Sequence, residues 1–326
     1  MRKELIVASV LLLAQLALAA ALAQRDGALN ASPQPKPLLQ GGAPASVDRL
    51  VVTGEKGDRL EVKREKEGWR LPGYFGAPVA EGKAKSAIEA VAGAKLDHPV
   101  ATSKGAAERF EVAEGRFSRK VELFAGKKRV AAFFLGKSAG VDRTYLRPFG
   151  EKNVYAAKVP EWRFPAKPER WFDQELLRPE AKALDAVEVD GLKLVKKKEG
   201  WRLEGNPGAR LKEGAARHLL SALAGARADA IAADEPDPSW HLDKPLRRLA
   251  LHGKAGDATW LLYKPKKKAY HLLKSSRHPW YLKLESWNAK PLLDASSAAA
   301  LVERGKGSDE EKGSGSGETK PAKSAK

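Results

Sequence analysis

The chain has 326 residues, of which 43% are hydrophobic and 31% are charged, and this length and composition suit two modest hydrophobic cores. It contains no cysteine, which excludes disulfides, thiolate metal sites and a cysteine nucleophile. The formal net charge of +18 favours anionic partners such as lipid headgroups, acidic polymers or nucleic acid, but charge alone does not choose among them.

The first 23 residues have the pattern of an export segment. Two basic residues precede an apolar run from Leu5 to Ala23, which ends abruptly at polar residues. The run is long enough to cross a bilayer as a helix, and Ala21-Leu22-Ala23 also has the form of a signal-peptide cleavage site. Residues 1–23 are therefore expected to be either an uncleaved transmembrane anchor or a cleaved signal segment.

The basic residues ahead of the apolar run also predict an orientation. By the positive-inside rule, the amino end stays in the cytoplasm and the folded body lies outside it. For a bacterial source, we expect a single-pass inner-membrane protein with its body in the periplasm, or a secreted protein after cleavage near Ala23. The membrane is thus an expected partner through the amino-terminal helix.

Two further segments have little apolar content. Residues 24–45 contain four prolines and a glycine pair, which predicts a Pro/Gly-rich spacer. Residues 301–326 are rich in lysine, glycine, serine and glutamate, which predicts a disordered tail.

The hexapeptide Lys-Glu-Gly-Trp-Arg-Leu occurs twice, at Lys66–Leu71 and at Lys198–Leu203. This repetition predicts a tandem duplication with copies at residues 46–178 and 179–300. The expected fold class is α+β, with each copy an antiparallel sheet and one covering helix, preceded by the amino-terminal membrane helix or signal segment.

Each copy is expected to begin with a β-hairpin, followed by the Gly-Trp-Arg-Leu strand and a helix. Apolar residues alternate between Leu50 and Val62 around a turn, and Asp190-Gly191 is a typical two-residue hairpin turn in the second copy. The helices are predicted from apolar residues at helical spacing: Ala84, Ile88 and Val91 in the first copy, and Ala216, Leu219, Leu220 and Leu223 in the second.

Later strands and a closing Trp-x-x-x-x-Leu-Leu segment are expected in each copy, at Trp171–Leu177 and Trp287–Leu293. The offset between copies falls from 132 to 116 residues, which predicts shorter late loops in the second copy. The aromatic residues expected to form the core of the repeat are Trp69, Trp201, Trp171, Trp287, Tyr145, Tyr155, Tyr270 and Tyr281.

No catalytic, cofactor or metal site is predicted. Gly136–Gly140 matches the pattern G-x-S-x-G, but a strand is expected after it rather than a helix, so it is interpreted as a hairpin loop. The same residues do not complete a phosphate-binding loop, because Ala131 stands where its first glycine is required. The histidines lack metal-ligand spacing, and the acidic residues at 234–237 are interpreted as a solvated turn.

Two lysine runs are the candidate contacts for an anionic surface: Lys196, Lys197, Lys198, Lys264, Lys266, Lys267 and Lys268. In one interpretation they bind an acidic lipid headgroup or an anionic cell-envelope polymer. In the other they solvate turns and protect sheet edges. Nucleic acid is not an expected partner, because no nucleic-acid module is present and export removes most nucleic acid from reach.

Several segments follow one another in a recognisable order, from Val47 to Leu293: Gly-Trp-Arg-Leu at Trp69, Phe110 with Val112, Leu135-Gly136, Thr144-Tyr145-Leu146, Val154-Tyr155 and Trp171–Leu177. This order resembles the bacterial envelope proteins grouped as domain of unknown function 4340. Two departures are present: Glu111-Val112 replaces the family's Gly-Leu after Phe110, and the second copy has Trp240-His241-Leu242 there.

The resemblance implies an envelope partner and no established catalysis, because family members are often encoded beside auxiliary components of gliding-type ABC transporters. The expected function is a non-catalytic accessory or scaffold protein that works with an ABC-type membrane transport complex. The alternative is a binding module for an anionic envelope polymer or lipid headgroup, through the lysine runs.

Overall fold

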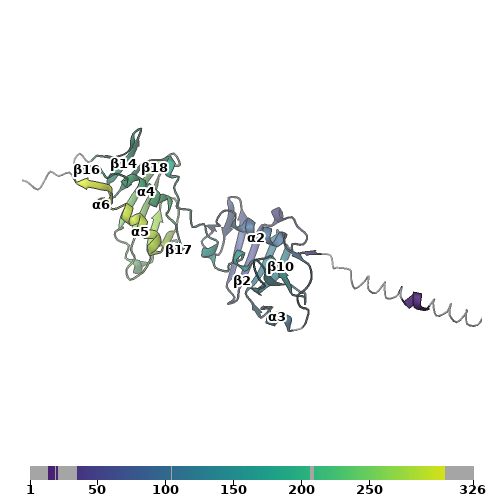
Figure 1. Cartoon of the computed structure of the whole chain (residues 1–326). Helices are drawn as coiled ribbons and strands as arrows, with labels where there is room; N and C mark the ends of the chain where they lie inside the picture. Colours follow the sequence, from purple (N-terminus) through teal and green to yellow (C-terminus); the bar gives the residue numbers. More distant parts are fainter. Residues whose placement is uncertain (1–13, 19, 21–34, 104, 206–208, 305–326) are drawn as a thin grey trace, which may run out of the picture. The chain divides into compact units, whose positions relative to one another are not determined.

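A computed structural model of the chain describes residues 14–18, 20, 35–103, 105–205 and 209–304 (Figure 1). It divides into two units, Met1–Trp171 and Phe172–Lys326. Each unit contains one antiparallel sheet of eight strands with helices packed against it. The chain is therefore an α+β protein with two large sheets.

The first sheet has the strand order β12-β11-β10-β9-β2-β3-β4-β5. Its strands are β2 (Arg49–Gly54), β3 (Arg59–Glu65), β4 (Gly68–Leu71), β5 (Ala77–Pro78), β9 (Arg119–Ala125), β10 (Lys128–Ser138), β11 (Thr144–Pro148) and β12 (Tyr155–Ala157). The predicted hairpin is confirmed: Leu50 pairs with Val62 across β2 and β3, and both are buried.

The second sheet has the strand order β15-β14-β13-β18-β19-β20-β21-β17. Its strands are β13 (Leu184–Val189), β14 (Leu192–Lys197), β15 (Gly200–Glu204), β17 (Ala230–Ala233), β18 (Arg247–Gly253), β19 (Ala258–Tyr263), β20 (His271–Ser275) and β21 (Tyr281–Leu284). The predicted turn between β13 and β14 is confirmed: Asp190 and Gly191 both have positive φ, at 48° and 90°.

Seven strands follow the same order in both sheets, since β12 to β4 in the first sheet occupy the places of β21 to β15 in the second. The two sheets differ at their edges. Where β17 pairs with β21, the first unit has a single bridge between Ala101 and Val154. Where β5 pairs with β4, the second unit has β16 (Ala209–Leu211), which pairs with β22 (Val302–Arg304) instead.

Each unit has one ten-residue helix that follows its Gly-Trp-Arg-Leu strand, α2 (Lys83–Ala92) and α4 (Ala215–Ala224) (Figure 1). Both helices begin after a glycine in the left-handed region, Gly82 at φ 71° and Gly214 at φ 73°. Residues with a Cβ disfavour this conformation, so the two glycines fix the same helix start in both units.

The buried stripe of α2 is confirmed at Ala84, Ile88 and Val91. In α4 the buried residues are Ala215, Leu219 and Leu223, whereas Ala216 and Leu220 are only half-buried. The predicted face of the second helix is therefore confirmed at Leu219 and Leu223, while burial is only partial at Ala216 and Leu220.

The second unit has a further ten-residue helix, α5 (Ser286–Ala295). The remaining elements are short: β1 (Lys36–Pro37), η1 (Pro44–Ser46), β6 (Lys95–Leu96), α3 (Ala106–Arg109), β7 (Val112–Ala113), β8 (Arg116–Phe117), η2 (Glu161–Arg163), η3 (Pro168–Arg170), η4 (Ala181–Ala183), η5 (Pro238–Trp240) and α6 (Ala298–Leu301). Two predicted boundaries are corrected by them. Leu38 and Leu39 are 4% and 9% exposed and β1 pairs with β6, so the first core begins before residue 46. Strand β22 extends the second unit to Arg304, beyond the predicted start of the tail at 301.

The predicted anchor or signal segment lies mostly outside the described residues, as does the tail from 305 onward. Residues 14–18 and 20 are helical. In the parts of the chain that the structure describes, no helix combines the length and the apolar composition that a membrane crossing requires.

Candidate functional site

The two lysine runs lie at opposite ends of the second sheet. Lys196 and Lys197 end β14, beside the start of β13 and the end of β18. Strand β19 begins at that same end, so the turn after it, which carries Lys264 and Lys266–Lys268, lies at the other end. The structure therefore does not bring the two runs together into one basic surface.

Parts of both runs are already engaged by the protein. The Lys196 Nζ donates to the Lys182 carbonyl at 3.2 Å, and the Lys264 Nζ donates to the Ala269 carbonyl at 3.1 Å. Hydrogen bonds from Ser239 hold the pKa of Asp237 below its ordinary value, and the nearby charge of Lys268 lowers it further. An acidic group thus offsets part of the positive charge at the second run.

The core aromatics predicted from the sequence have different environments. Trp171 and Tyr155 are buried, whereas Trp69, Trp201, Tyr145, Tyr270 and Tyr281 are half-buried. Trp69 packs beneath the Arg64 guanidinium, 4.9 Å from its ring centre. Trp287 is 69% exposed, so its assignment to the core was wrong.

The hydrogen bonds show which residue replaces Trp171 in the second unit. The Ala80 N–H donates to the Trp171 carbonyl at 2.9 Å, and the Lys212 N–H donates to the Leu301 carbonyl at the same distance. Ala80 and Lys212 are separated by the offset of 132 residues. Leu301 is fully buried, as Trp171 is, and is therefore its structural counterpart.

The counterpart of Trp287 is Trp162, which was not among the core or site residues predicted from the sequence. They are 69% and 68% exposed, and each lies in the helix that follows the last strand pair of its unit, Trp287 in α5 after β20–β21 and Trp162 in η2 after β11–β12. Arg163, next to Trp162, hydrogen-bonds the Ser86 carbonyl of α2 at 3.2 Å, and Trp287 lies near His218, which holds the place of Ser86 in α4. An exposed tryptophan therefore stands beside the main helix of each unit.

In the second unit, Trp287 borders an open hollow of about 520 Å³ between α4, α5 and α6. His218 and Ser221 line it from α4, and Trp287 and Asp294 line it from α5. Much of the remaining lining is alanine and glycine. These small side chains leave the space between α4 and α5 unfilled, and this space is the hollow.

The first turn of α5 is held in place by Asp229. Its carboxylate accepts hydrogen bonds from the Glu285 N–H at 2.7 Å and from the Asn288 amide at 2.9 Å. Trp287 lies between these two residues in the chain and is thereby fixed at the rim of the hollow. Pro291, one turn further on, has no N–H to donate to the Trp287 carbonyl, which leaves that acceptor without its helical partner.

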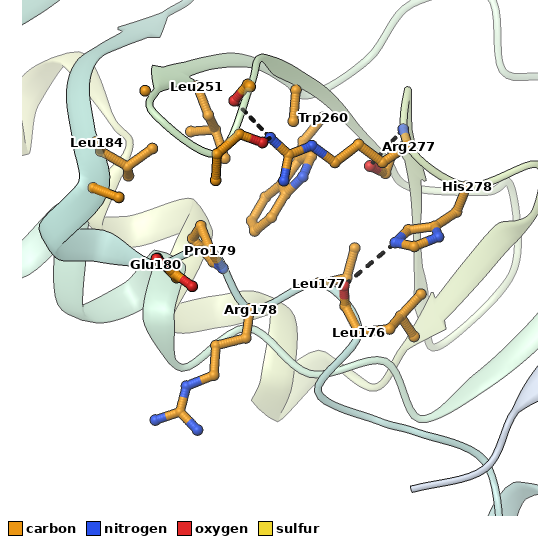
Figure 2. Close-up of a pocket in the computed structure, with 16 residues that line it drawn as sticks. Leu176, Leu177, Arg178, Pro179, Glu180, Leu184, Leu251, Trp260, Arg277 and His278 are labelled. Atoms are coloured by element: carbon orange, nitrogen blue, oxygen red, sulfur yellow. Dashed lines mark hydrogen bonds between the residues drawn. The ribbon is translucent and has the colours of Figure 1, made fainter. Parts of the chain in front are cut away.

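A second cavity lies at one end of the second sheet, among Leu184, Leu251, Trp260 and Arg277 (Figure 2). The Arg277 guanidinium donates to the carbonyls of Gly256 and Ala255 at 2.6 and 3.1 Å, so it closes the β18–β19 turn. The volume of about 40 Å³ has room for a few water molecules but not for a substrate.

His278 contacts the same cavity and is half-buried. Its Nε2 lies 3.3 Å from the Leu176 carbonyl, and its ring stacks on Trp280. Burial lowers the pKa of His278 by more than its hydrogen bond to the Leu176 carbonyl raises it, and the positive charge of Arg277 also lowers it. The imidazole is therefore neutral in the folded protein near pH 7.

The segment Gly136–Gly140, which formally matches a nucleophile elbow, spans the end of β10 and the turn after it. A Cβ on Gly136 would lie 2.0 Å from the Phe110 carbonyl oxygen, so this glycine lets another segment cross the strand. The Lys137 N–H donates to the same carbonyl at 3.1 Å. The motif has a packing role. Among the described residues, no group of histidine, aspartate and glutamate is arranged to hold a metal ion.

The crossing segment has the same backbone conformation in both units. Glu111 has φ 58° and His241 has φ 51°, so both adopt the left-handed conformation that glycine tolerates best. The Lys266 N–H donates to the Trp240 carbonyl at 3.3 Å, which repeats the bond between Lys137 and Phe110. Trp240-His241 thus takes the place of Phe110-Glu111.

Together these features define a class: an α+β protein of two antiparallel-sheet units, each with a main helix and an exposed tryptophan beside it. Residues 69–245 match the family described as Domain of unknown function (DUF4340), which covers more than half of the chain. The chain belongs to this family. No curated protein and no solved structure matched it.

Proposed function

We propose that the protein is a non-catalytic accessory or scaffold protein of the cell envelope that works with an ABC-type membrane transport complex. The observation that carries the proposal is the pair formed by Trp162 and Arg163. Trp162 is 68% exposed, and the Arg163 guanidinium lies 4.6 Å from its ring centre. Tryptophan and arginine are the residue types that most often dominate the energy of protein–protein interfaces.

The pair is held ready for a partner. Arg163 is anchored on α2 by its bonds to Ser86, and its guanidinium lies against the Trp162 ring. A side chain that is already ordered loses less conformational entropy when it binds. This arrangement suits a contact with another protein better than a catalytic role.

The proposal also includes a tandem duplication and export from the cytoplasm. The common order of seven strands, the paired glycines before α2 and α4, and the paired exposed tryptophans support a tandem duplication of one unit. The apolar run of residues 1–23 supports export, either as a single-pass inner-membrane protein or by cleavage near Ala23. The folded units would then lie in the periplasm.

Affinity purification from detergent-solubilised membranes tests the transport proposal. The full-length protein should recover a permease or its accessory subunit, and Trp162→Ala should lose that subunit while melting at the same temperature as wild type. Repeated recovery of the protein alone would argue against a transport partner. If the Trp162→Ala variant recovered the transport subunit as well as wild type does, Trp162 would not be the contact with that subunit.

A second candidate is binding to an anionic lipid headgroup or envelope polymer. It is favoured by Lys266, Lys267 and Lys268, which are exposed side by side in one turn. Binding to vesicles that contain an anionic lipid should then weaken strongly with salt, because exposed charges are screened within about 8 Å at physiological ionic strength. Unchanged binding after replacement of Lys264 and these three lysines by glutamine would exclude this candidate.

A further inference from the structure

The hollow beside Trp287 has a lining that selects one kind of ligand. It contains the indole of Trp287, side chains that form hydrogen bonds and small residues, but no leucine, isoleucine or valine. The apolar face of a partner helix would therefore find few aliphatic side chains to pack against. Its volume of about 520 Å³ lies within the usual range of small-ligand sites, about 300–1,000 Å³.

The charges at the hollow also restrict the ligand. Although the chain carries a net charge of +18, no lysine or arginine lines this hollow. The Asp294 carboxylate, which does line it, pairs with Lys290 at 2.5 Å. An anionic headgroup would meet this carboxylate, and the Lys290 ammonium beside it is already paired, so the lining fits a neutral ligand.

We propose that this hollow binds a neutral saccharide. A sugar ring has one face of C–H groups, which packs on the exposed indole of Trp287, and a rim of hydroxyls. His218, Ser221 and Asp294 supply donors and acceptors for those hydroxyls. Asp229 fixes the first turn of α5 and with it the backbone position of Trp287.

The first unit provides a matched control. Trp162 is as exposed as Trp287, but Arg163 lies against its ring and fills the space toward Ser86. The same tryptophan position therefore faces a hollow in one unit and a guanidinium in the other. Saccharide binding is expected at Trp287 and not at Trp162, and it does not depend on the proposed transport partner.

Isothermal titration of the full-length protein with three neutral hexasaccharides, chitohexaose, cellohexaose and maltohexaose, tests the site. At least one should bind, with an affinity that does not change between low and high salt, because no ion pair is formed. Trp287→Ala should weaken binding about tenfold, which corresponds to about 1.4 kcal/mol. Trp162→Ala should stay within about twofold of wild type, a difference below about 0.5 kcal/mol.

Ala222→Leu gives an independent test, because it fills the hollow from α4 without removing Trp287. It should also weaken binding, and thermal melting would show that the fold is kept. The proposal is overturned if none of the three sugars binds at about 5 mM, a concentration that detects affinities near −3 kcal/mol. Equal losses in Trp162→Ala and Trp287→Ala, or binding that salt abolishes, would overturn it as well.

Discussion

At the scale of single residues, backbone conformation sets the cost of a side chain at particular positions. His241 has φ 51° at the end of η5, and Glu111 has φ 58° in the corresponding segment of the first unit. Because the left-handed region costs a residue with a Cβ roughly 1–2 kcal/mol, His241→Gly should be more stable than His241→Ala by about 1 kcal/mol. Urea unfolding of the two variants measures the difference. An alanine variant as stable as the glycine variant would contradict the conformational argument.

Gly136 is constrained by space instead of by φ. Its position under the Phe110 carbonyl leaves no room for a methyl group, so Gly136→Ala must displace the crossing segment or bend β10. We expect a loss of about 1–3 kcal/mol in the free energy of unfolding. Gly115→Ala is the control, because a Cβ there meets no atom within 4 Å. Equal stability of the two variants would show that the crossing is looser than the structure indicates.

The buried imidazole of His278 predicts how stability depends on pH. Its pKa in the folded protein is lowered by burial, while the unfolded chain keeps an ordinary value of about 6.5. The unfolded chain therefore binds more protons between the two values, and the free energy of unfolding rises with pH across that window. The contribution is fully present above about pH 6.5 and is lost as the pH falls.

Denaturant unfolding between pH 5 and pH 7.5 checks this dependence. His278→Gln keeps an amide donor near the Leu176 carbonyl and cannot titrate, so its stability should change less with pH than that of wild type. Some dependence should remain, because burial also lowers the pKa of His271. A variant with the same slope as wild type would show that the pKa of His278 is not lowered in the folded protein.

At the scale of elements, the tryptophans divide into structural and surface positions. Trp171 is fully buried and its indole N–H donates to the Pro165 carbonyl at 2.7 Å. Trp171→Ala should lower the free energy of unfolding by about 3–5 kcal/mol. Trp162→Ala and Trp287→Ala should change it by less than about 0.5 kcal/mol, because both side chains are exposed. If Trp287→Ala lowered the free energy of unfolding as much as Trp171→Ala does, Trp287 would have to be a core residue.

Elements with strong local patterns were predictable from the sequence. The Asp190-Gly191 turn and the alternation around Leu50 and Val62 gave the correct hairpins, because each depends on residues that are close in the chain. The match of Trp171 with Trp287 was wrong, because a shared Trp-x-x-x-x-Leu-Leu spacing concealed a different arrangement. Only the hydrogen bonds of Ala80 and Lys212, which join distant segments, identify Leu301 as the counterpart of Trp171.

The candidate site was the less predictable part. The two lysine runs are visible in the sequence as dense groups of positive charge. The register of β13, β14, β18 and β19 nevertheless places them at opposite ends of the sheet. The equivalence of Trp162 and Trp287 could have been predicted, because each closely follows the second Tyr-containing strand expected in its copy. Their exposure and the hollow beside Trp287 depend on how α5 packs on α4, which no local pattern encodes.

At the scale of the whole molecule, two units with the same strand order carry different surfaces. The first presents Trp162 with Arg163, and the second presents Trp287 at the rim of a hollow. We propose that the first surface contacts a protein partner and the second a saccharide, so the two functions should be separable by single substitutions. Trp162→Ala should affect only the protein partner, and Trp287→Ala only the saccharide.

Site-specific photo-crosslinking in intact cells tests the scaffold proposal most directly. A photoreactive amino acid at position 162 should crosslink to a subunit of a membrane transport complex. The same group at position 141 should not, although Val141 is 91% exposed and equally accessible to a chance neighbour. The proposal would be contradicted if position 162 gave no crosslinked protein, or if positions 162 and 141 gave the same products.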